Sequence, residues 1–400
     1  FYNHQHVNPE GGVRDQLFPY LRISFKDDIT RKKLQYSIPR LRMDGRVVGC
    51  KSHEQNASSI LQLTCNRNIP TAGWVSFEGE QIVKNKETYC DEEYIVPSIN
   101  LEEYKGETKI VHPLVLAFDL EVNSYKITTF PSAKNNEDRV FQISCVFHRK
   151  GEEKKSYLLT LGNPDSDNTY TTRCFKTESE LLVGFTDLIQ EKNPNIITGY
   201  NIFSFDIPYL IDRCKRPDIA VMRKFDKQGF LKNVHSAEKQ IKWTSNAYKN
   251  QDFRFLDTEG RLYVDLLPIV QRDYKLDNYK LKTVSQHFIG DTKDDLDAPG
   301  IFLSYRMCME SFKEQQKKDK NQEFNQEVID KGNKQLGICG DYCIQDSVLC
   351  IDLFNKLQTW IYLTEMAKVC QVPPITLYTQ GQQIKVFSQV YKMCLHNNYI

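Results

Sequence analysis

Two carboxylates stand two residues apart inside an otherwise apolar run of the sequence. The run HPLVLAFDLEV contains Asp119 and Glu121 near its end. A stretch of this kind is typical of a central strand buried on both faces, and residues two apart in a strand project from the same face. Burying two carboxylates is costly unless a cation or a donor compensates them. The pattern therefore predicts a site for magnesium or manganese, with a solvated strand end as the alternative.

A second acidic position lies where a strand is expected to pass into a helix. NIITGYN reads as a strand, and FDIPYLIDRCK as a helix with Pro208 in its first turn. Asp206 would then lie at the carboxyl end of a strand, where open α/β sheets collect their ligands. Two other interpretations stay open: Asp206 can be an N-cap, and Asn201 a turn residue.

Tyr342 and Asp346 are four residues apart in GDYCIQDSVLCIDLFNKL, so they share one face of a predicted helix. A surface tyrosine–aspartate pair is the alternative. The combination of the three motifs favours a catalytic metal site over these alternatives. A D-x-E strand, an N-x-x-x-F-D strand end and a Y-x-x-x-D helix occur in this order within one expected α/β domain, and their joint coincidence is much rarer than any single match.

This order resembles the DEDD exonucleases of the ribonuclease H-like fold, in the subgroup that carries a tyrosine. More narrowly, FDLEV (118–122), GYNIFSFDIPYL (199–210) and YCIQDSVL (342–349) resemble the three exonuclease motifs of family B DNA polymerases. The segments 265–290 and 365–391 are similar to delta-type polymerases. LFPYLRISF and IPTAGWVSFEG are similar to the N-terminal domain of polymerases from large nucleocytoplasmic DNA viruses.

The resemblance implies hydrolysis of the terminal phosphodiester of DNA in the 3′→5′ direction by two Mg²⁺ ions, with Mn²⁺ able to substitute. Asp119 would bridge both ions. Glu121 and Asp346 would complete the tighter site, and Asp206 would hold the second ion largely through water. Two such ions offset the charge of the attacking and leaving oxygens.

The resemblance also assigns roles to three other side chains. Tyr342 would orient the attacking water through its hydroxyl. Asn201 and Phe205 would contact the terminal nucleotide, Phe205 by stacking on the base. For Phe205, a core position under the following helix is an equal alternative. The implied partners are the primer 3′ end of DNA and a sliding clamp, the latter bound through a part of the polymerase outside this chain.

The expected fold class is α/β: an exonuclease domain with a mixed sheet flanked by helices, preceded by a small mixed α+β domain. The expected boundaries are 1–108 for the N-terminal domain, 109–357 for the exonuclease domain and 358–400 for the start of the polymerase palm. FRFLDTEGRLYVDLL reads as two strands, expected as a hairpin that helps part primer from template or as an ordinary edge hairpin. The charged stretch 313–336 reads as a solvated helix or a disordered loop.

Composition narrows the class of protein further. A length of 400 residues suggests two domains, and the net charge of +1 shows no global basic field, although a carboxylate cluster would offset a basic channel. The 12 cysteines include no C-x-x-C pair, which favours free thiols over a zinc site. No apolar stretch approaches the ~18 residues of a membrane span, and the N-terminus lacks a signal pattern. We expect an intracellular protein, in the nucleus or at a cytoplasmic site of viral replication.

The palm motifs S-L-Y-P-S and Y-G-D-T-D of family B polymerases do not occur in the sequence. With a start at Phe1 and an end at Ile400 inside a helical pattern, we expect a piece of a longer polymerase that does not polymerise DNA alone. Two alternatives remain. A stand-alone DEDD exonuclease would end soon after Asp346, whereas here GQQIKVFSQVY follows. A silent DNA-binding scaffold would have lost its carboxylates.

Overall fold

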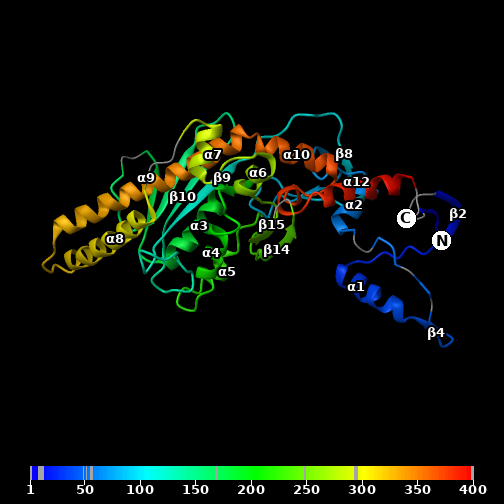
Figure 1. The fold of residues 1–400 in the computed structure, drawn as a ribbon, viewed down its shortest axis with the longest axis horizontal. Coiled ribbons are helices and arrows are strands. Elements are labelled where there is room, and N and C mark those ends of the chain that lie inside the picture. Colours follow the sequence, from blue (N-terminus) through cyan, green and yellow to red (C-terminus); the bar gives the residue numbers. More distant parts are fainter. Residues whose placement is uncertain are drawn as a thin grey trace. The chain divides into compact units, whose positions relative to one another are not determined.

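The computed structural model describes residues 2–7, 13–47, 49–50, 52–54, 57–166, 169–246, 249–291 and 296–397. The chain divides into two compact units (Figure 1). One unit comprises Phe1–Glu80, Val96–Lys109 and Tyr362–Ile400, and the other comprises Gln81–Ile95 and Ile110–Ile361. The final residues thus cluster with the N-terminal ones, while their assignment to a polymerase palm stays a prediction.

A six-stranded mixed sheet forms the centre of the larger unit, in the order β12-β11-β10-β9-β13-β16. β10 is antiparallel to both β9 and β11, whereas β12 is parallel to β11, β13 to β9 and β16 to β13. The mixed sheet expected from the sequence is confirmed. Its strands are β9 (Val115–Val122), β10 (Val140–His148), β11 (Lys155–Leu161), β12 (Thr171–Phe175), β13 (Ile196–Gly199) and β16 (Leu262–Asp265).

Helices cover both faces of this sheet. Phe118 of β9 packs on Phe185 of α3 with ring centroids 5.2 Å apart, while α9 packs against β9, β10 and β11. Because neighbouring residues of a strand face opposite sides, the side chains next to Phe118 turn towards α9. The helices of this unit are α3 (Glu178–Lys192), α4 (Asp206–Cys214), α5 (Met222–Phe225), α6 (Leu266–Asp273), α7 (Leu281–Phe288), α8 (Ala298–Asp319) and α9 (Gln326–Lys356).

Local sequence explains where several of these helices begin and end. Thr177 and Glu180 form a capping box at the start of α3, and Asn193 closes that helix in the left-handed conformation with φ 52°. The helix therefore stops at Asn193–Pro194, as the sequence indicated. Asp265 caps α6 by accepting from the backbone N–H of Leu267.

The charged stretch 313–336 is helical over most of its length, so its helix interpretation is confirmed. It forms the end of α8 and the start of α9, which lie side by side as a long helical pair (Figure 1). The sequence placed the start of the last helix near Gly340, but α9 begins at Gln326. Contact with α8 stabilises this polar extension, a tertiary effect that periodicity does not reveal.

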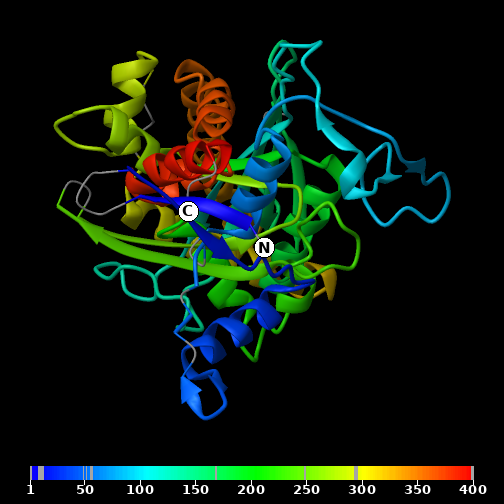
Figure 2. The same ribbon diagram turned by 90° about the vertical axis from the view of Figure 1, so that its right-hand side faces the viewer.

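The expected hairpin within FRFLDTEGRLYVDLL is wrong. Its two halves are strands, but β15 (Lys249–Asp257) pairs with β14 (Ala237–Ser245), and β16 joins the central sheet beside β13. Figure 2 shows β14 and β15 as a separate two-stranded ribbon. The polar character of residues 237–245 hid β14, since its side chains are largely exposed and form no apolar run.

The smaller unit mixes short strands and helices. Its α2 packs against α12 through Leu61, Cys65 and Tyr391, and Thr71 donates a hydrogen bond of 2.7 Å to the carbonyl oxygen of Ala367. Ile400 lies outside the described residues. The elements of this unit are β1 (Tyr2–Val7), β2 (Val13–Tyr20), α1 (Asp28–Ser37), η1 (Ile38–Arg40), β3 (Arg42–Met43), β4 (Arg46–Val47), α2 (Ser59–Arg67), β5 (Val75–Phe77), η2 (Ser98–Asn100), β8 (Leu101–Glu103), α11 (Thr376–Thr379) and α12 (Gln383–His396). Residues of both units contribute to β6 (Glu80–Gln81) and α10 (Thr359–Cys370), and β7 (Tyr94–Ile95) belongs to the larger unit. Among the described residues, no helix is long and apolar enough to cross a membrane.

A buried ion pair joins three segments of the larger unit. Arg213 of α4, whose side chain is fully buried, bonds through Nε to the Glu178 carboxylate at 2.8 Å. Its Nη1 donates to the carbonyl oxygen of Asn135 at 2.6 Å, in the β9–β10 connection. Glu178 also accepts from the backbone N–H of Val140 at 2.9 Å. The pair thus fixes α3, α4 and that connection together.

Arg213→Ala should lower the free energy of unfolding by about 3–5 kcal/mol, because it leaves the Glu178 carboxylate buried without its charge partner. Urea unfolding measures this. Lys331→Ala is the matched control: it removes an exposed ion pair of 2.6 Å with Glu327 and should change little. A loss for Arg213→Ala as small as that of the control would contradict the role of the buried pair.

Candidate active site

Asp119 and Glu121 project together from β9 towards α9. One carboxylate oxygen of each and the sulfur of Cys343 lie within 4.8 Å of one another. The prediction that the two carboxylates share a face of the strand is therefore confirmed. Glu121 is buried, with 3% of its surface exposed, and Asp119 is half-buried, so the site is not a solvated strand end.

Tyr342 and Asp346 lie on α9, and both are buried, with 7% and 4% of their surfaces exposed. The alternative of a surface pair is therefore wrong. Ser347, next to Asp346, is hydrogen-bonded through its hydroxyl to the hydroxyl of Ser144 at 2.7 Å. Ser144 is the residue of β10 directly opposite Asp119. This bond sets the position of α9 on the strand pair that carries the first two carboxylates.

Asp206 is the first residue of α4, and Phe205 occupies the N-cap position without a capping side chain. The N-cap interpretation of Asp206 is therefore wrong. Asp206 is 3% exposed. Burial raises its pKa well above the usual value, and the negative charge of Asp119 raises it further. A carboxylate this close to another one in a buried position is stabilised by a cation.

One buried thiol shows that all three motifs converge. Burial raises the pKa of Cys350 on α9, and the nearby charges of Asp119, Asp346 and Asp206 raise it further, in that order. These three carboxylates come from a strand, a helix and a strand end that are far apart in the sequence. All three lie near enough to Cys350 for their charges to act on its thiol.

The turn between β13 and α4 is held by Asp265, a carboxylate that sequence reasoning missed. Its oxygens accept from the backbone N–H groups of Asn201 at 2.8 Å, Phe203 at 2.9 Å and Leu267 at 3.0 Å. Burial raises the pKa of Asp265 to about 6, and these hydrogen bonds oppose the rise. Asn201 is a turn residue with φ 65°, as one interpretation held. In the sequence, Asp265 looks like an ordinary helix N-cap, so no local pattern indicates that it also holds the turn before α4.

Gly199 lets this turn pass close to β9. A Cβ added there would lie 2.8 Å from the backbone oxygen of Phe118 and 2.5 Å from a methyl group of Ile202. Since both contacts are shorter than side chains tolerate, a glycine is required where β13 ends beside the Asp119 strand.

Two aromatic rings meet beside Asp206. Phe205 is half-buried, and its ring lies edge-on to that of Phe130 with centroids 5.1 Å apart. Phe130 is 77% exposed, so Phe205 is not enclosed in the core. Asp138 orders the connection that carries Phe130, because its carboxylate accepts from the backbone N–H groups of Tyr125 at 2.6 Å and Ser132 at 2.8 Å. Sequence reasoning missed Phe130, which lies in a polar loop.

The side chains present fit a divalent cation. Hard carboxylate oxygens of Asp119 and Glu121 converge, and burial together with the charge of Asp119 raises the pKa of Asp206. Cys343 is the soft member of the group. Burial raises the pKa of its thiol well above the usual value, the charges of Glu121 and Asp119 raise it further, and its S–H donates to the backbone oxygen of Asp119 at 3.7 Å. A neutral thiol packs beside the carboxylates rather than competing with them for a hard cation.

Asp265→Ala should lower the free energy of unfolding by roughly 3 kcal/mol or more, because it leaves three backbone donors buried without an acceptor. Asp265→Asn keeps one oxygen and should cost less. Urea unfolding at pH 7 in EDTA measures both, with the exposed Asp277→Ala as control. An Asp265→Ala variant as stable as Asp277→Ala would show that the turn does not depend on this carboxylate.

Comparison with known proteins agrees with this geometry. The family model described as "DNA polymerase family B, exonuclease domain" matches residues 50–284, so α9 lies beyond the matched range. The chain is 46% identical to DNA polymerase 120R of Invertebrate iridescent virus 3, over 94% of this chain and 33% of that protein. It is 32% identical to the putative DNA polymerase 060R of Frog virus 3, over 98% and 37%. It is 28% identical to the DNA polymerase delta catalytic subunit of Candida albicans, over 96% and 34%.

The chain thus spans about a third of the length of these relatives. Exonuclease domains of this family use divalent metals, in keeping with the carboxylate cluster. On the match to the family model and the similarity along nearly its whole length, the chain belongs to the family B DNA polymerases and carries their exonuclease domain.

Proposed function

We propose that this chain removes nucleotides from the 3′ end of single-stranded DNA, as the proofreading part of a replicative polymerase. The observation that supports the proposal is the pair of Asp119 and Glu121 facing α9, with Asp206 and Asp346 from two other elements near the same buried Cys350 thiol. The strand order, with one antiparallel strand among parallel neighbours, supports a ribonuclease H-like fold.

Asp119, Glu121, Asp206 and Asp346 would hold two divalent cations, Mg²⁺ or Mn²⁺. When bound, the cations supply positive charge that offsets an anionic nucleophile, the phosphate and the leaving oxygen. The buried setting makes each such interaction stronger than it would be in water. Tyr342, on the same helix as Asp346, would hold the attacking water through its hydroxyl, which can both donate and accept.

Phe205 and Phe130 would contact the terminal base between the β13–α4 turn and the β9–β10 connection. Their edge-on contact leaves Phe130 exposed for a base to displace or stack upon. Stacking tolerates any base, as a proofreading site requires. Asn201 starts the same turn and would contact the terminal nucleotide. A frayed 3′ end costs less energy to unpair, which biases excision towards mismatches.

The wider assignments rest on the relatives. Polymerisation, the primer–template substrate and a sliding clamp would belong to a protein about three times as long as this chain. We keep the division into an N-terminal domain, an exonuclease domain and the start of a palm as part of this proposal. Action in the nucleus or at a cytoplasmic site of viral replication would follow from the same role.

Asp119→Ala should reduce Mg²⁺-dependent degradation of 5′-labelled single-stranded DNA by roughly a thousandfold or more, because it removes one of the carboxylates that would hold the cations. Its stability in EDTA should not fall, since the charge that raises the pKa of Asp206 is gone. The exposed Asp187→Ala is the control. A rate for Asp119→Ala above about a tenth of wild type would refute the assignment. A wild-type chain that folds but leaves no 3′→5′ ladder with either metal would favour the silent scaffold.

Phe205→Ala and Phe130→Ala should each raise KM for single-stranded DNA about tenfold, since one stacked ring is worth roughly 1–3 kcal/mol. kcat should change less than KM, because neither ring holds the cations. Steady-state kinetics on an oligonucleotide separate the two constants. Exposed Phe324→Ala on the α8–α9 connection is the matched control. Unchanged KM in both variants would remove the rings from the proposed binding site.

A further inference from the structure

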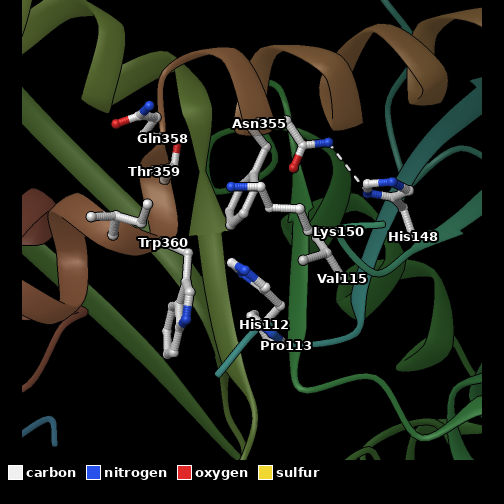
Figure 3. Close-up of a pocket in the computed structure, with 11 residues that line it drawn as sticks. His112, Pro113, Val115, His148, Lys150, Asn355, Gln358, Thr359 and Trp360 are labelled. Atoms are coloured by element: carbon white, nitrogen blue, oxygen red, sulfur yellow. Dashed lines mark hydrogen bonds between the residues drawn. The ribbon is translucent and has the colours of Figure 1, made fainter. Parts of the chain in front are cut away.

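A cavity of about 240 Å³ lies at the other end of β9 from the carboxylates (Figure 3). Val115, the first residue of β9, lines it, whereas Asp119 lies four residues further along the strand, about 13 Å away. All the residues that line the cavity belong to the larger unit. The cavity is therefore separate from the candidate active site, although both are built on β9 and α9.

The first turn of α10 forms one side of this cavity and leaves a buried hydroxyl without a partner. Thr359, the first residue of this 12-residue helix, lines the cavity and is 1% exposed. Within the described part of the chain, its Oγ1 has no hydrogen-bond partner. An unsatisfied buried hydroxyl is costly, so it indicates a ligand with polar atoms. The positive end of a helix dipole favours an anion at the same place.

Basic side chains from two other segments face the same space. His112 precedes β9, His148 is the last residue of β10, and Lys150 lies in the turn that follows it. Figure 3 shows the Lys150 chain reaching across the cavity and the His112 ring beside it. The nearby Asp352 carboxylate accepts from Lys154 at 2.7 Å, so its charge is already compensated. Burial and Lys154 lower the pKa of His148, whose Nδ1 contacts the amide of Asn355 at 3.2 Å. Lys150, an exposed side chain, brings an ammonium group to the cavity.

An indole ring completes the lining. Trp360 donates through Nε1 to the backbone oxygen of Val111 at 2.8 Å, which fixes the orientation of its ring at the edge of the cavity (Figure 3). A planar aromatic group next to an ammonium and a helix N-terminus matches the two parts of a nucleotide, its base and its phosphate.

We propose that this cavity binds one nucleotide unit, with its phosphate at Lys150 and the Thr359 hydroxyl and its base against Trp360. The volume is slightly below the roughly 300–1,000 Å³ of common small-molecule sites, which suits a single unit. The unit can be a free mononucleotide or one nucleotide of a single strand, since both offer the same base and phosphate. Bound there, it would join the start of α10 to the end of β10. This site does not depend on the proposed exonuclease activity.

Isothermal titration calorimetry of the chain in EDTA tests the site. Deoxyadenosine monophosphate should bind with one equivalent, and deoxyadenosine, which lacks the phosphate, at least tenfold more weakly. Lys150→Ala and Thr359→Val should each weaken binding of the monophosphate about tenfold, whereas Lys155→Ala, an exposed lysine on β11 that does not line the cavity, should not. Asp206→Asn should bind the monophosphate as the wild type does, which separates this site from the carboxylates.

The source of the nucleotide follows from a second titration with a six-residue oligodeoxyadenylate. Tighter binding of the oligonucleotide, weakened by Lys150→Ala, assigns the cavity to single-stranded DNA; tighter binding of the monophosphate assigns it to free nucleotide. Equal affinity for deoxyadenosine and its monophosphate would overturn the proposal, as would wild-type affinity in both cavity variants. Absence of binding by either probe at millimolar concentration would overturn it as well. Urea unfolding confirms that Lys150→Ala and Thr359→Val are folded.

Discussion

The close approach of buried carboxylates is the constraint on which the rest of this structure depends. Asp119, Asp206 and Asp346 repel one another, and burial removes the water that would screen them. A chain left to itself would separate or protonate these groups. Packing elsewhere in the fold therefore has to hold these groups together, and bound cations would offset the repulsion between them.

A different set of contacts fixes the position of each carboxylate. The pairing of β9 with β10 fixes Asp119 and Glu121, and the Ser144–Ser347 bond transfers that position to α9 and hence to Asp346. The position of Asp206 depends on Asp265, whose carboxylate accepts hydrogen bonds from the backbone N–H groups of the preceding turn. The serine pair is neutral, whereas the charge of Asp265 adds to the rise in the pKa of Asp206. A metal site built from these carboxylates would depend on the supporting residues as well as on the carboxylates.

The same two elements carry two sites of opposite charge. The carboxylates gather where β9 ends and along the middle of α9, while Lys150 and the α10 N-terminus gather around the start of β9 and the end of α9. A strand and a helix that cross once can present an acidic face at one end and a basic one at the other. The separation keeps the ammonium from pairing with the carboxylates, which would compete with cations at the first site.

The sequence alone indicated which side chains of the candidate site share a face, because strand and helix periodicities place Asp119 beside Glu121 and Tyr342 beside Asp346. It also located β9, β13 and β16 of the central sheet, since a doubly buried strand needs a continuous apolar run. Only the tertiary structure decided that Asp206 is not a cap, that β15 pairs with β14 rather than β16, and that α9 starts at Gln326. β14 was missed because its exposed polar side chains form no apolar run, whereas the roles of Asp265 and Phe130 come from contacts between residues distant in sequence. The periodicity of the sequence does not reveal such contacts, because the local pattern around a loop residue is the same whether or not it contacts a distant residue in the fold.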